Sequence, residues 1–427
     1  MKYSVDVLIA GTGVAGLNCA LNLRKDLRVL LISKSEVRDT NTYLAQGGIS
    51  TARNKEDISL FVEDTIKAGG YENKIDAVKV LAEESIENIS DLINYGLELD
   101  KSDSDLSYTR EGAHSINRIV HSKDQTGKAV AETLIKEAKK RHNIELWEYT
   151  TLVDILKKDN KCVGGILLKH NETIEVSAKA VVVATGGIGG LFNDSTNQRE
   201  LTGDGISIAI KNGIKLKNID YIQFHPTGFY NGESNERRFL ISESLRGEGA
   251  KLFNLKGQRF VDELLPRDKV SEAIMKEISR SNIPYVHLDI SFLDSDYIIN
   301  RFPTIYEQCL KAGFDITKEP IPVSPTQHYF MGGIETDIYA RTSMENLYAA
   351  GETSCTGVHG RNRLASNSLL EGLVFSKRAA KVINNTINRI DIENLTSMSY
   401  TLELDKNMLI GELKRRSEKL NDELFCY

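Results

Sequence analysis

The chain has few cysteines, and none is placed for joint chemistry. Five cysteines are spread over 427 residues, at Cys19, Cys162, Cys309, Cys355 and Cys426. The odd number and the absence of any C-x-x-C pair argue against a disulfide framework, a zinc site or an iron–sulfur cluster. The histidines show no ligand spacing with carboxylates either. We therefore expect no metal and a reducing compartment.

Long apolar runs and an excess of basic charge are also missing. Glycines interrupt the longest apolar candidate, around residues 180–192, so no run approaches the ~20 residues that a membrane helix needs. Asp6 and several glycines likewise interrupt the apolar start, which argues against a secretory leader. Lysine and arginine number 54 against 60 aspartate and glutamate residues, so nucleic acid is not an expected partner. We expect a cytoplasmic protein that contacts no membrane.

Proline is scarce and confined to one part of the chain. All seven prolines lie between Pro226 and Pro325, while buried strands with glycine turns are predicted on both sides of this stretch. The length favours two or three domains. We predict an α/β fold in which a Rossmann-like nucleotide-binding domain is interrupted by an α+β capping domain and followed by a short helical tail. The expected boundaries are 1–220 and 330–385 for the nucleotide-binding domain, 221–329 for the cap and 386–427 for the tail.

Hydrophobic periodicity gives the expected elements. The strands are expected at 3–10, 28–32, 146–149, 152–157, 163–170, 172–178, 180–184 and 346–352. The helices are expected at 17–23, two or three within 58–95, 127–140, 368–382 and one or two within 400–425.

A glycine-rich motif follows the first strand and opens the first helix. Gly11, Gly13 and Gly16 have the spacing of a dinucleotide fingerprint, in which backbone approaches a pyrophosphate and helix meets strand closely. The acidic ribose ligand of that fingerprint is not evident, because the second strand ends in Ser33-Lys34. Ser33 could bond a ribose hydroxyl, and Lys34 could meet a phosphate.

Further glycine clusters occur at residues 46–48, 185–187, 202–205 and 351–352. Any one of them is better explained by a turn of an ordinary fold. Together they indicate an extended ligand touched by several strand ends. Ser368 and Glu371 have the spacing of a capping box that opens a helix, and such an N-terminus favours an anion. A helix capped for its own stability is the alternative.

Histidine and arginine gather at the borders of the proline-rich insert. His225, Arg246, Arg267, His328 and Arg363 all flank glycine turns or prolines. A single histidine before proline is usually structural. The set as a whole supplies the donors that a small dicarboxylate needs in a cleft, each charge-assisted bond contributing about 1.5–3 kcal/mol.

The ordered motifs resemble the fumarate reductase and succinate dehydrogenase flavoprotein family over about residues 3–385. The resemblance is carried by Gly11 to Gly16, Ala45 to Gly48, Thr109 to His114, His225 to Thr227, Leu245 to Gly249, Pro266 to Asp268, His328 to Gly333 and His359 to Glu371. Covalent members of the family have a histidine five residues before Gln46, where this chain has Asn41. The resemblance therefore implies noncovalent FAD, and it favours the branch that oxidises L-aspartate.

The resemblance also implies residue roles. His225, His328 and Arg363 would bind substrate carboxylates. Arg267 would lie beside the reacting carbons and act as proton donor when fumarate is reduced. Glu111 would face the substrate amino group, and Ser242 stands where threonine is common. The implied FAD contacts are Gly11, Gly13, Val14, Ala15, Gly16, Ser33, Lys34, Thr42, Ala45, Gln46, Gly47, Gly48, Thr185, Gly186, Gly187, Asp204, Glu352, Ser366, Asn367, Ser368 and Leu369.

The implied reaction yields iminoaspartate, with oxygen or fumarate as acceptor, and feeds quinolinate synthase in NAD biosynthesis. A succinate- or fumarate-acting flavoprotein subunit is an alternative, and a flavin-binding module without catalysis is another. Two departures from the family stand out. Arg361 replaces a small residue expected near the flavin, and the C-terminal region is shorter than in longer relatives.

Overall fold

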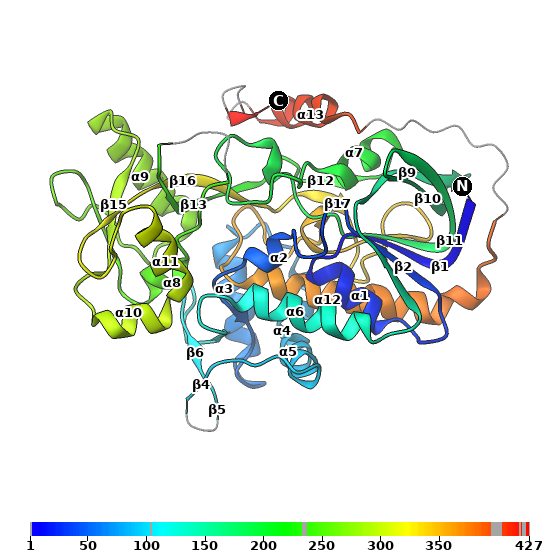
Figure 1. Ribbon diagram of the computed structural model, residues 1–427, viewed down its shortest axis with the longest axis horizontal. Helices are drawn as coiled ribbons and strands as arrows, with labels where there is room; N and C mark the ends of the chain where they lie inside the picture. The colour runs from blue at the N-terminus through cyan, green and yellow to red at the C-terminus, as the bar shows by residue number, and fades with distance from the viewer. Residues whose placement is uncertain are drawn as a thin grey trace.

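The computed structural model describes residues 2–102, 105–232, 237–393, 404–417, 420 and 424–426. Among these residues a large sheet with its covering helices lies at one end of the molecule and a smaller sheet at the other (Figure 1). Of the helices so described, none is both long and apolar enough to cross a bilayer.

The larger sheet contains seven of the described strands and is parallel at its centre. Its order is β8-β2-β1-β11-β10-β9, with β18 beside the end of β11. Strand β10 is antiparallel to both of its neighbours, β9 and β11, and all other pairs of neighbouring strands in this sheet are parallel. This arrangement confirms the Rossmann-like α/β prediction. The bounds are β1 Lys2–Ala10, β2 Val29–Ile32, β8 Ile144–Trp147, β9 Thr150–Lys158, β10 Lys161–Lys169, β11 Glu172–Val183 and β18 Leu347–Ala349.

Side chains of β1 alternate between two hydrophobic cores, as the pleat of a strand requires. Val7 and Ile9 join the core beneath helices α1 (Val14–Asn22), α6 (Thr126–Lys139) and α12 (Asn367–Thr386), which lie on one face of the sheet (Figure 1). Leu8 and Ala10 join the core on the other face. Burial on both faces explains why these strands are almost continuously apolar.

The smaller sheet is antiparallel, with the order β13-β16-β15-β14. It has its own hydrophobic core with four helices around it, which confirms an α+β capping domain containing the prolines. The exact domain limits stay a prediction. The bounds are β13 Ile222–Phe229, α8 Glu243–Gly247, β14 Lys251–Phe253, α9 Arg267–Ser281, β15 Val286–Asp289, α10 Ser295–Arg301, α11 Pro303–Lys311 and β16 Ile321–Phe330.

Smaller elements complete the described chain. The α-helices are α2 Asn41–Leu44, α3 Ile58–Ala68, α4 Ile75–Glu83, α5 Ser85–Asn94, α7 Asp204–Lys211 and α13 Lys406–Arg416, and the 3-10 turns are η1 Gly189–Leu191, η2 Gly351–Thr353 and η3 Ile387–Arg389. The short strands are β3 Ile49–Ser50, β4 Lys101–Ser102, β5 Asp105–Leu106, β6 Tyr108–Thr109, β7 Ile119–Val120, β12 Leu216–Lys217, β17 Gly333–Glu335 and β19 Ser354–Cys355.

The predicted capping box at the start of α12 is wrong. The helix begins at Asn367, Ser366 is its N-cap residue, and no side chain caps it. Ser368 instead accepts a hydrogen bond from Arg363, and the Glu371 carboxylate accepts bonds from residues outside the helix. Both side chains of the motif therefore bond to residues outside the helix. The helix also continues past residue 382 to Thr386.

Two further expectations differ from the structure. The strands expected at 172–178 and 180–184 form one strand, β11, which ends at Val183; Lys179 stays in the strand and pairs with Asp6 at 2.9 Å. One edge of β11 pairs first with β10 and then with β18, so its apolar character changes along its length. Of the predicted helix within 400–425, the described part is α13, and residues 400–403, 418, 419 and 421–423 lie outside the described residues.

Candidate active site

One cavity extends from the glycine-rich loop after β1 to the junction with the capping domain. Its wall is built from strand ends, from the N-terminus of α12 and from capping-domain residues. Arg246 of the predicted donor set does not line this cavity, whereas all residues to which the resemblance assigns a role do, except Gly16, Gly187 and Asn367. Those three lie just behind the wall, where Asn367 is fully buried and bonded to Ser50 and Thr65.

The three fingerprint glycines have different reasons to be glycine. Gly11 has φ +114°, and a Cβ there would stand 2.1 Å from the Ala184 carbonyl oxygen. At Gly16 a Cβ would stand 1.8 Å from the Gly11 carbonyl oxygen. At Gly13, which lines the cavity, only the Thr42 hydroxyl lies within 4 Å, at 3.3 Å. Two of the glycines thus allow helix and strand to pack, and the third leaves room in the cavity.

Lys34 and Asp204, predicted from separate motifs, meet at one end of the cavity. The Lys34 ammonium donates to Asp204 Oδ2 at 2.8 Å and to Thr202 Oγ1 at 3.0 Å. Ser33, on the same strand end, accepts a hydrogen bond from Thr12. Lys34 therefore joins the end of β2 to the start of α7 and already has a carboxylate partner.

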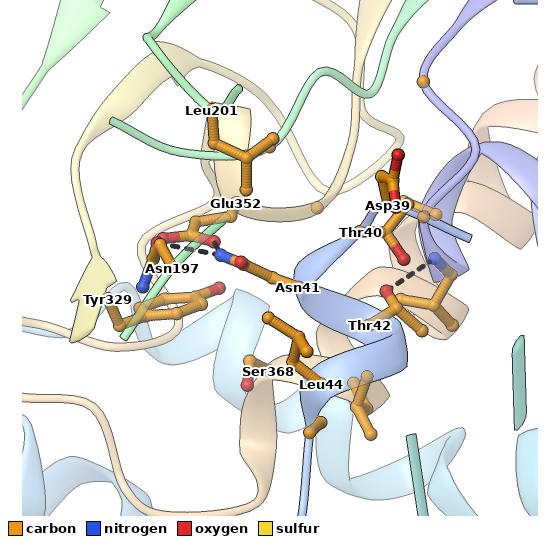
Figure 2. Close-up of a pocket in the computed structure, with 18 of the residues that line it drawn as sticks. Asp39, Thr40, Asn41, Thr42, Leu44, Asn197, Leu201, Tyr329, Glu352 and Ser368 are labelled. Atoms are coloured by element: carbon orange, nitrogen blue, oxygen red, sulfur yellow. Dashed lines mark hydrogen bonds between the residues drawn. The ribbon is translucent and has the colours of Figure 1, made fainter. Parts of the chain in front are cut away.

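Asn41 occupies the position of the family's flavin-linking histidine. Figure 2 shows its side chain extending from α2 toward Asn197 and Glu352. Its amide donates to Asn197 Oδ1 at 2.8 Å and to Glu352 Oε2 at 3.5 Å. Glu352 accepts from the Phe330 N–H, and burial raises the pKa of Glu352 to about 7. A carboxamide offers no nucleophilic nitrogen here.

The cavity wall also shows the features that a bound flavin dinucleotide requires. Helix α12 presents its N-terminus at Ser368 and Leu369 with no side chain capping it, and such an end favours an anion. The side-chain amide oxygen of Gln46, Oε1, is buried without a partner among the described residues, which leaves an acceptor for a ligand N–H. The glycine-rich loop after β1, the N-terminus of α12 and the unpaired Gln46 side chain therefore fit FAD.

Two histidines and two arginines meet at the capping-domain end. The rings of His225 and His328 are 5.1 Å apart and steeply inclined. His225 Nε2 and two guanidinium nitrogens of Arg363, Nε and Nη2, are buried without a partner among the described residues. Arg267 opens α9 and lines the same wall. The structure thus brings together the two histidines and two of the arginines predicted to bind a diacid.

Burial controls the charge of these side chains. Burial, followed by the charge of Arg267, holds the pKa of His225 well below its usual value, and burial and the charge of Arg363 do the same for His328. Burial beside Arg267 lowers the pKa of Arg363 to about 10. Both imidazoles are therefore neutral near pH 7, and the two guanidiniums carry the positive charge.

Glu111 is held on the cavity wall by two hydroxyl groups. Its oxygens accept from Ser244 Oγ at 2.9 Å and from Ser366 Oγ at 2.6 Å. Burial and the nearby Glu243 raise the pKa of Glu111. Ser242 is the N-cap residue of α8 and accepts from the Ser244 N–H, so it holds the turn that carries Ser244.

Sequence reasoning missed the partners of the predicted cations. Arg267 Nε donates to Glu243 Oε2 at 2.5 Å, and Arg267 Nη1 donates to Gln223 Oε1 at 2.9 Å. Burial favours protonation of Glu243, but Arg267 and Arg246 outweigh that effect and lower its pKa. Glu243 and Arg246 are three residues apart on α8. That spacing favours an ion pair on a helix and was the signal in the sequence that Glu243 has a cationic neighbour.

Arg361 does not lie where it was expected. It is absent from the cavity wall, its side chain is 62% exposed, and it pairs with Glu72. The neighbouring Arg363 turns inward while Arg361 turns toward solvent. The expectation of an additional charge beside the flavin is therefore wrong.

The fold and this cavity define a flavin-dependent oxidoreductase. Residues 6–369 match the family described as FAD binding domain. In structure the chain is similar to a variant of E. coli quinol fumarate reductase FrdA, with a TM-score of 0.86 and 30% identity over 99% of this chain and 75% of that one. It is also similar to the Mycobacterium smegmatis Sdh1 complex, with a TM-score of 0.78 and 33% identity over 91% of this chain and 69% of that one.

Sequence similarity specifies the group further. The chain is 54% identical to the L-aspartate oxidase of Clostridium perfringens over 99% of this chain and 98% of that protein. It is 55% identical to the L-aspartate oxidase of Clostridium acetobutylicum over 99% of both. The chain therefore belongs to the L-aspartate oxidase family of FAD-binding proteins, which confirms the predicted resemblance.

Proposed function

We propose that this chain catalyses the FAD-dependent oxidation of L-aspartate to iminoaspartate. The observation that carries the proposal is the shared cavity, in which Arg267, Arg363, His225 and His328 line the wall together with the glycine loop and the start of α12. A four-carbon diacid needs several buried donors at one end of such a cavity, and a dinucleotide needs exposed backbone at the other.

FAD would be held by the predicted contact residues that line the cavity. The loop at Gly13 would receive the pyrophosphate, Glu352 and Gln46 would contact the cofactor by hydrogen bonds, and the start of α12 would face the anionic edge of the ring system. When bound, FAD accepts the hydride from the substrate Cα. Gly16, Gly187 and Asn367 would support this surface from behind.

The substrate carboxylates would be bound mainly by Arg363, His225 and His328. Arg363 Nε and Nη2 and His225 Nε2 are donor or acceptor positions without partners among the described residues, and a carboxylate fits two N–H groups of one guanidinium. Each such bond contributes about 1.5–3 kcal/mol. Ser242 would act by holding the turn of α8 beside them.

Arg267 would hold or move the proton next to the reacting carbons. It is buried on the cavity wall, and its Nε–H is directed to Glu243. The Glu243 carboxylate is a proton acceptor in direct contact with that guanidinium, and it gives the arginine a fixed orientation. That proton would be delivered to carbon when fumarate is reduced, whereas oxidation of L-aspartate removes a hydride from Cα and a proton from nitrogen.

Glu111 would distinguish aspartate from succinate. A carboxylate on the cavity wall pairs with the ammonium group of aspartate and is left unpaired by succinate. Its raised pKa would also allow Glu111 to accept the amine proton as the imine forms.

The test is anaerobic mixing of the flavin-loaded protein with L-aspartate or, separately, with succinate. Loss of the yellow flavin absorbance with L-aspartate and not with succinate is the expected result. Bleaching by succinate with no response to aspartate would instead assign a respiratory-type reaction and overturn the proposal.

We further propose that FAD is bound noncovalently, because Asn41 supplies a carboxamide and no imidazole. Acid denaturation should release all of the flavin into the supernatant. Flavin that stays with the precipitated protein would contradict this. Oxygen or fumarate would reoxidise the enzyme, and iminoaspartate would pass to quinolinate synthase in a cytoplasmic route to NAD.

A further inference from the structure

Tyr329 lies against Arg363, and its hydroxyl leads to a buried carboxylate on α12. The Arg363 guanidinium carbon is 4.2 Å from the centre of the Tyr329 ring. The Tyr329 hydroxyl donates to Glu371 Oε2 at 2.9 Å. Arg363, Tyr329 and Glu371 are each less than a tenth exposed. The three groups form a chain from cation to ring to anion.

Two further neighbours contact the Glu371 carboxylate. His359 Nε2 lies 2.9 Å from the same carboxylate oxygen, and the Thr356 hydroxyl donates to the other oxygen. The His359 ring is perpendicular to the Tyr329 ring at 5.4 Å. Burial favours protonation of Glu371, but His359 and the hydroxyl donors outweigh that effect and keep its pKa below the usual value. Glu371 is therefore an anion.

Arg267 and Arg363 differ in how they are held. Arg267 is bound directly by the Glu243 carboxylate. Arg363 donates one N–H to Ser368 and rests on the Tyr329 ring, while its Nε and Nη2 have no partner among the described residues. A direct ion pair would occupy the N–H groups that a substrate carboxylate needs, whereas contact through the ring leaves them free.

We infer that Glu371 and Tyr329 are positioning residues that place Arg363 for a substrate carboxylate. The phenol donates to an anion, which increases electron density in the ring and strengthens its attraction for the guanidinium. Glu371 thus acts on Arg363 through Tyr329 without touching it. The inference rests on the proposed function, in which Arg363 binds a carboxylate.

The direct test is succinate affinity in the flavin-loaded protein, measured by the change in flavin absorbance. Tyr329→Phe keeps the ring and removes the hydroxyl, and Glu371→Gln removes the charge. Each should weaken succinate binding about tenfold, as expected for loss of one bond to a charged group. The KM for L-aspartate should rise similarly, while kcat changes less than about threefold.

Thr356→Val is the matched control, since it removes a bond from the same carboxylate on the side away from Tyr329. It should change succinate affinity less than about twofold. An Arg363→Lys background tests the route, because lysine lacks the planar group that rests on the ring. In that background Tyr329→Phe should also change the affinity less than about twofold.

Two results would overturn the inference. One is unchanged succinate affinity in Tyr329→Phe at normal flavin content. The other is an equal loss from Tyr329→Phe in both backgrounds, which would indicate a general structural role. If the unmodified protein binds succinate but is not bleached by aspartate, the proposed reaction fails and the affinity measurements still decide the inference. If it binds no diacid, both fail.

Discussion

The two ends of the cavity are built from different materials. At the glycine-loop end the wall is largely backbone, and Gly11 and Gly16 are required because strand and helix touch there. At the capping-domain end the wall is made of buried charged side chains. Of these, Arg267 has an ion-pair partner, and Arg363 has N–H groups that contact no acceptor in the described part of the chain. Ligand binding at the backbone wall depends on the shape of the chain, whereas ligand binding at the charged wall depends on which side-chain groups have no protein partner.

This difference has an energetic consequence. Leaving a buried guanidinium partly unpaired is unfavourable in the protein alone, because desolvation of the charge is not compensated. A bound dianion would supply that compensation. Substitutions at the two ends should therefore fail differently: those in the backbone wall should lose cofactor, and those in the charged wall should keep cofactor and lose reaction or substrate.

Arg267→Leu should give the largest effect on turnover. We expect kcat for aspartate oxidation and for fumarate reduction to fall roughly 10²–10⁴-fold, the range for loss of a proton-transferring group. Flavin content should stay near that of the unmodified protein, because Arg267 belongs to the charged wall. Steady-state kinetics at matched flavin content provide the measurement, and near-normal turnover would contradict the role.

Gly16→Ala should break the backbone wall, since its Cβ would meet the Gly11 carbonyl oxygen at 1.8 Å. We expect a loss of about 3 kcal/mol or more in unfolding free energy and no retained flavin. Gly13→Ala meets only the Thr42 hydroxyl at 3.3 Å, so it should keep the fold and lose flavin affinity.

Gly411→Ala is the control for that comparison, because nothing lies within 4 Å of the added Cβ. Gly411 lies in helix α13, where alanine should increase the stability by no more than about 1 kcal/mol. Thermal unfolding and flavin absorbance of the three variants are the measurements. Equal flavin retention in Gly13→Ala and Gly411→Ala would remove Gly13 from the cofactor wall.

Glu111→Gln should separate the two substrates within the charged wall. We expect kcat/KM for aspartate to fall by at least about tenfold, as for a lost contact with a charged group. Fumarate reduction should change less than about threefold, since fumarate has no ammonium group to recognise. Equal losses in both reactions would argue against recognition of the amino group.

The pH dependence of stability should reflect the buried imidazole of His114. Its Nε2 lies 3.0 Å from the Ala365 carbonyl oxygen, and burial lowers its pKa to about 4. The unfolded chain takes up this proton near pH 6.5, so stability falls as the pH is lowered from 6.5 toward 4. Between pH 7 and pH 5 the contribution of His114 to this loss should be about 2 kcal/mol.

Urea unfolding at pH 7 and pH 5 measures that loss, and His114→Gln supplies the comparison. The variant should lose less stability than the unmodified protein over the same interval. Identical pH dependence in both proteins would show that His114 does not contribute.

Arg361→Ala should give the smallest effect. Its exposed side chain pairs with Glu72 and is absent from the cavity wall, and surface ion pairs contribute little. We expect kcat/KM for aspartate to change less than about twofold, consistent with a surface role. A larger change in kcat/KM would indicate that Arg361 acts close to the reacting groups.

The backbone features of the fold were predictable from sequence because they are encoded locally. The motif from Gly11 to Gly16 lies between a strand and a helix as predicted, and the apolar run of β11 corresponds to a strand buried on both faces. The proline-rich insert likewise forms a separate sheet with its own core.

Side-chain partners were less predictable, because they join segments far apart in the chain. Arg267 and Glu243 are 24 positions apart and meet only through the packing of α8 and α9. Glu371 has the spacing of a capping box but accepts a hydrogen bond from Tyr329 on strand β16. Which partner a buried polar group selects depends on the folded arrangement, and sequence spacing does not contain it.

The most direct test of the account is a crystal structure of the oxidised, FAD-bound protein with succinate. The diacid should lie in the cavity with one carboxylate within about 3.2 Å of Arg363 nitrogens, its central carbons beside Arg267, and the flavin ring at the start of α12. Succinate bound outside this cavity, or inside it with no contact to Arg363, would contradict the account.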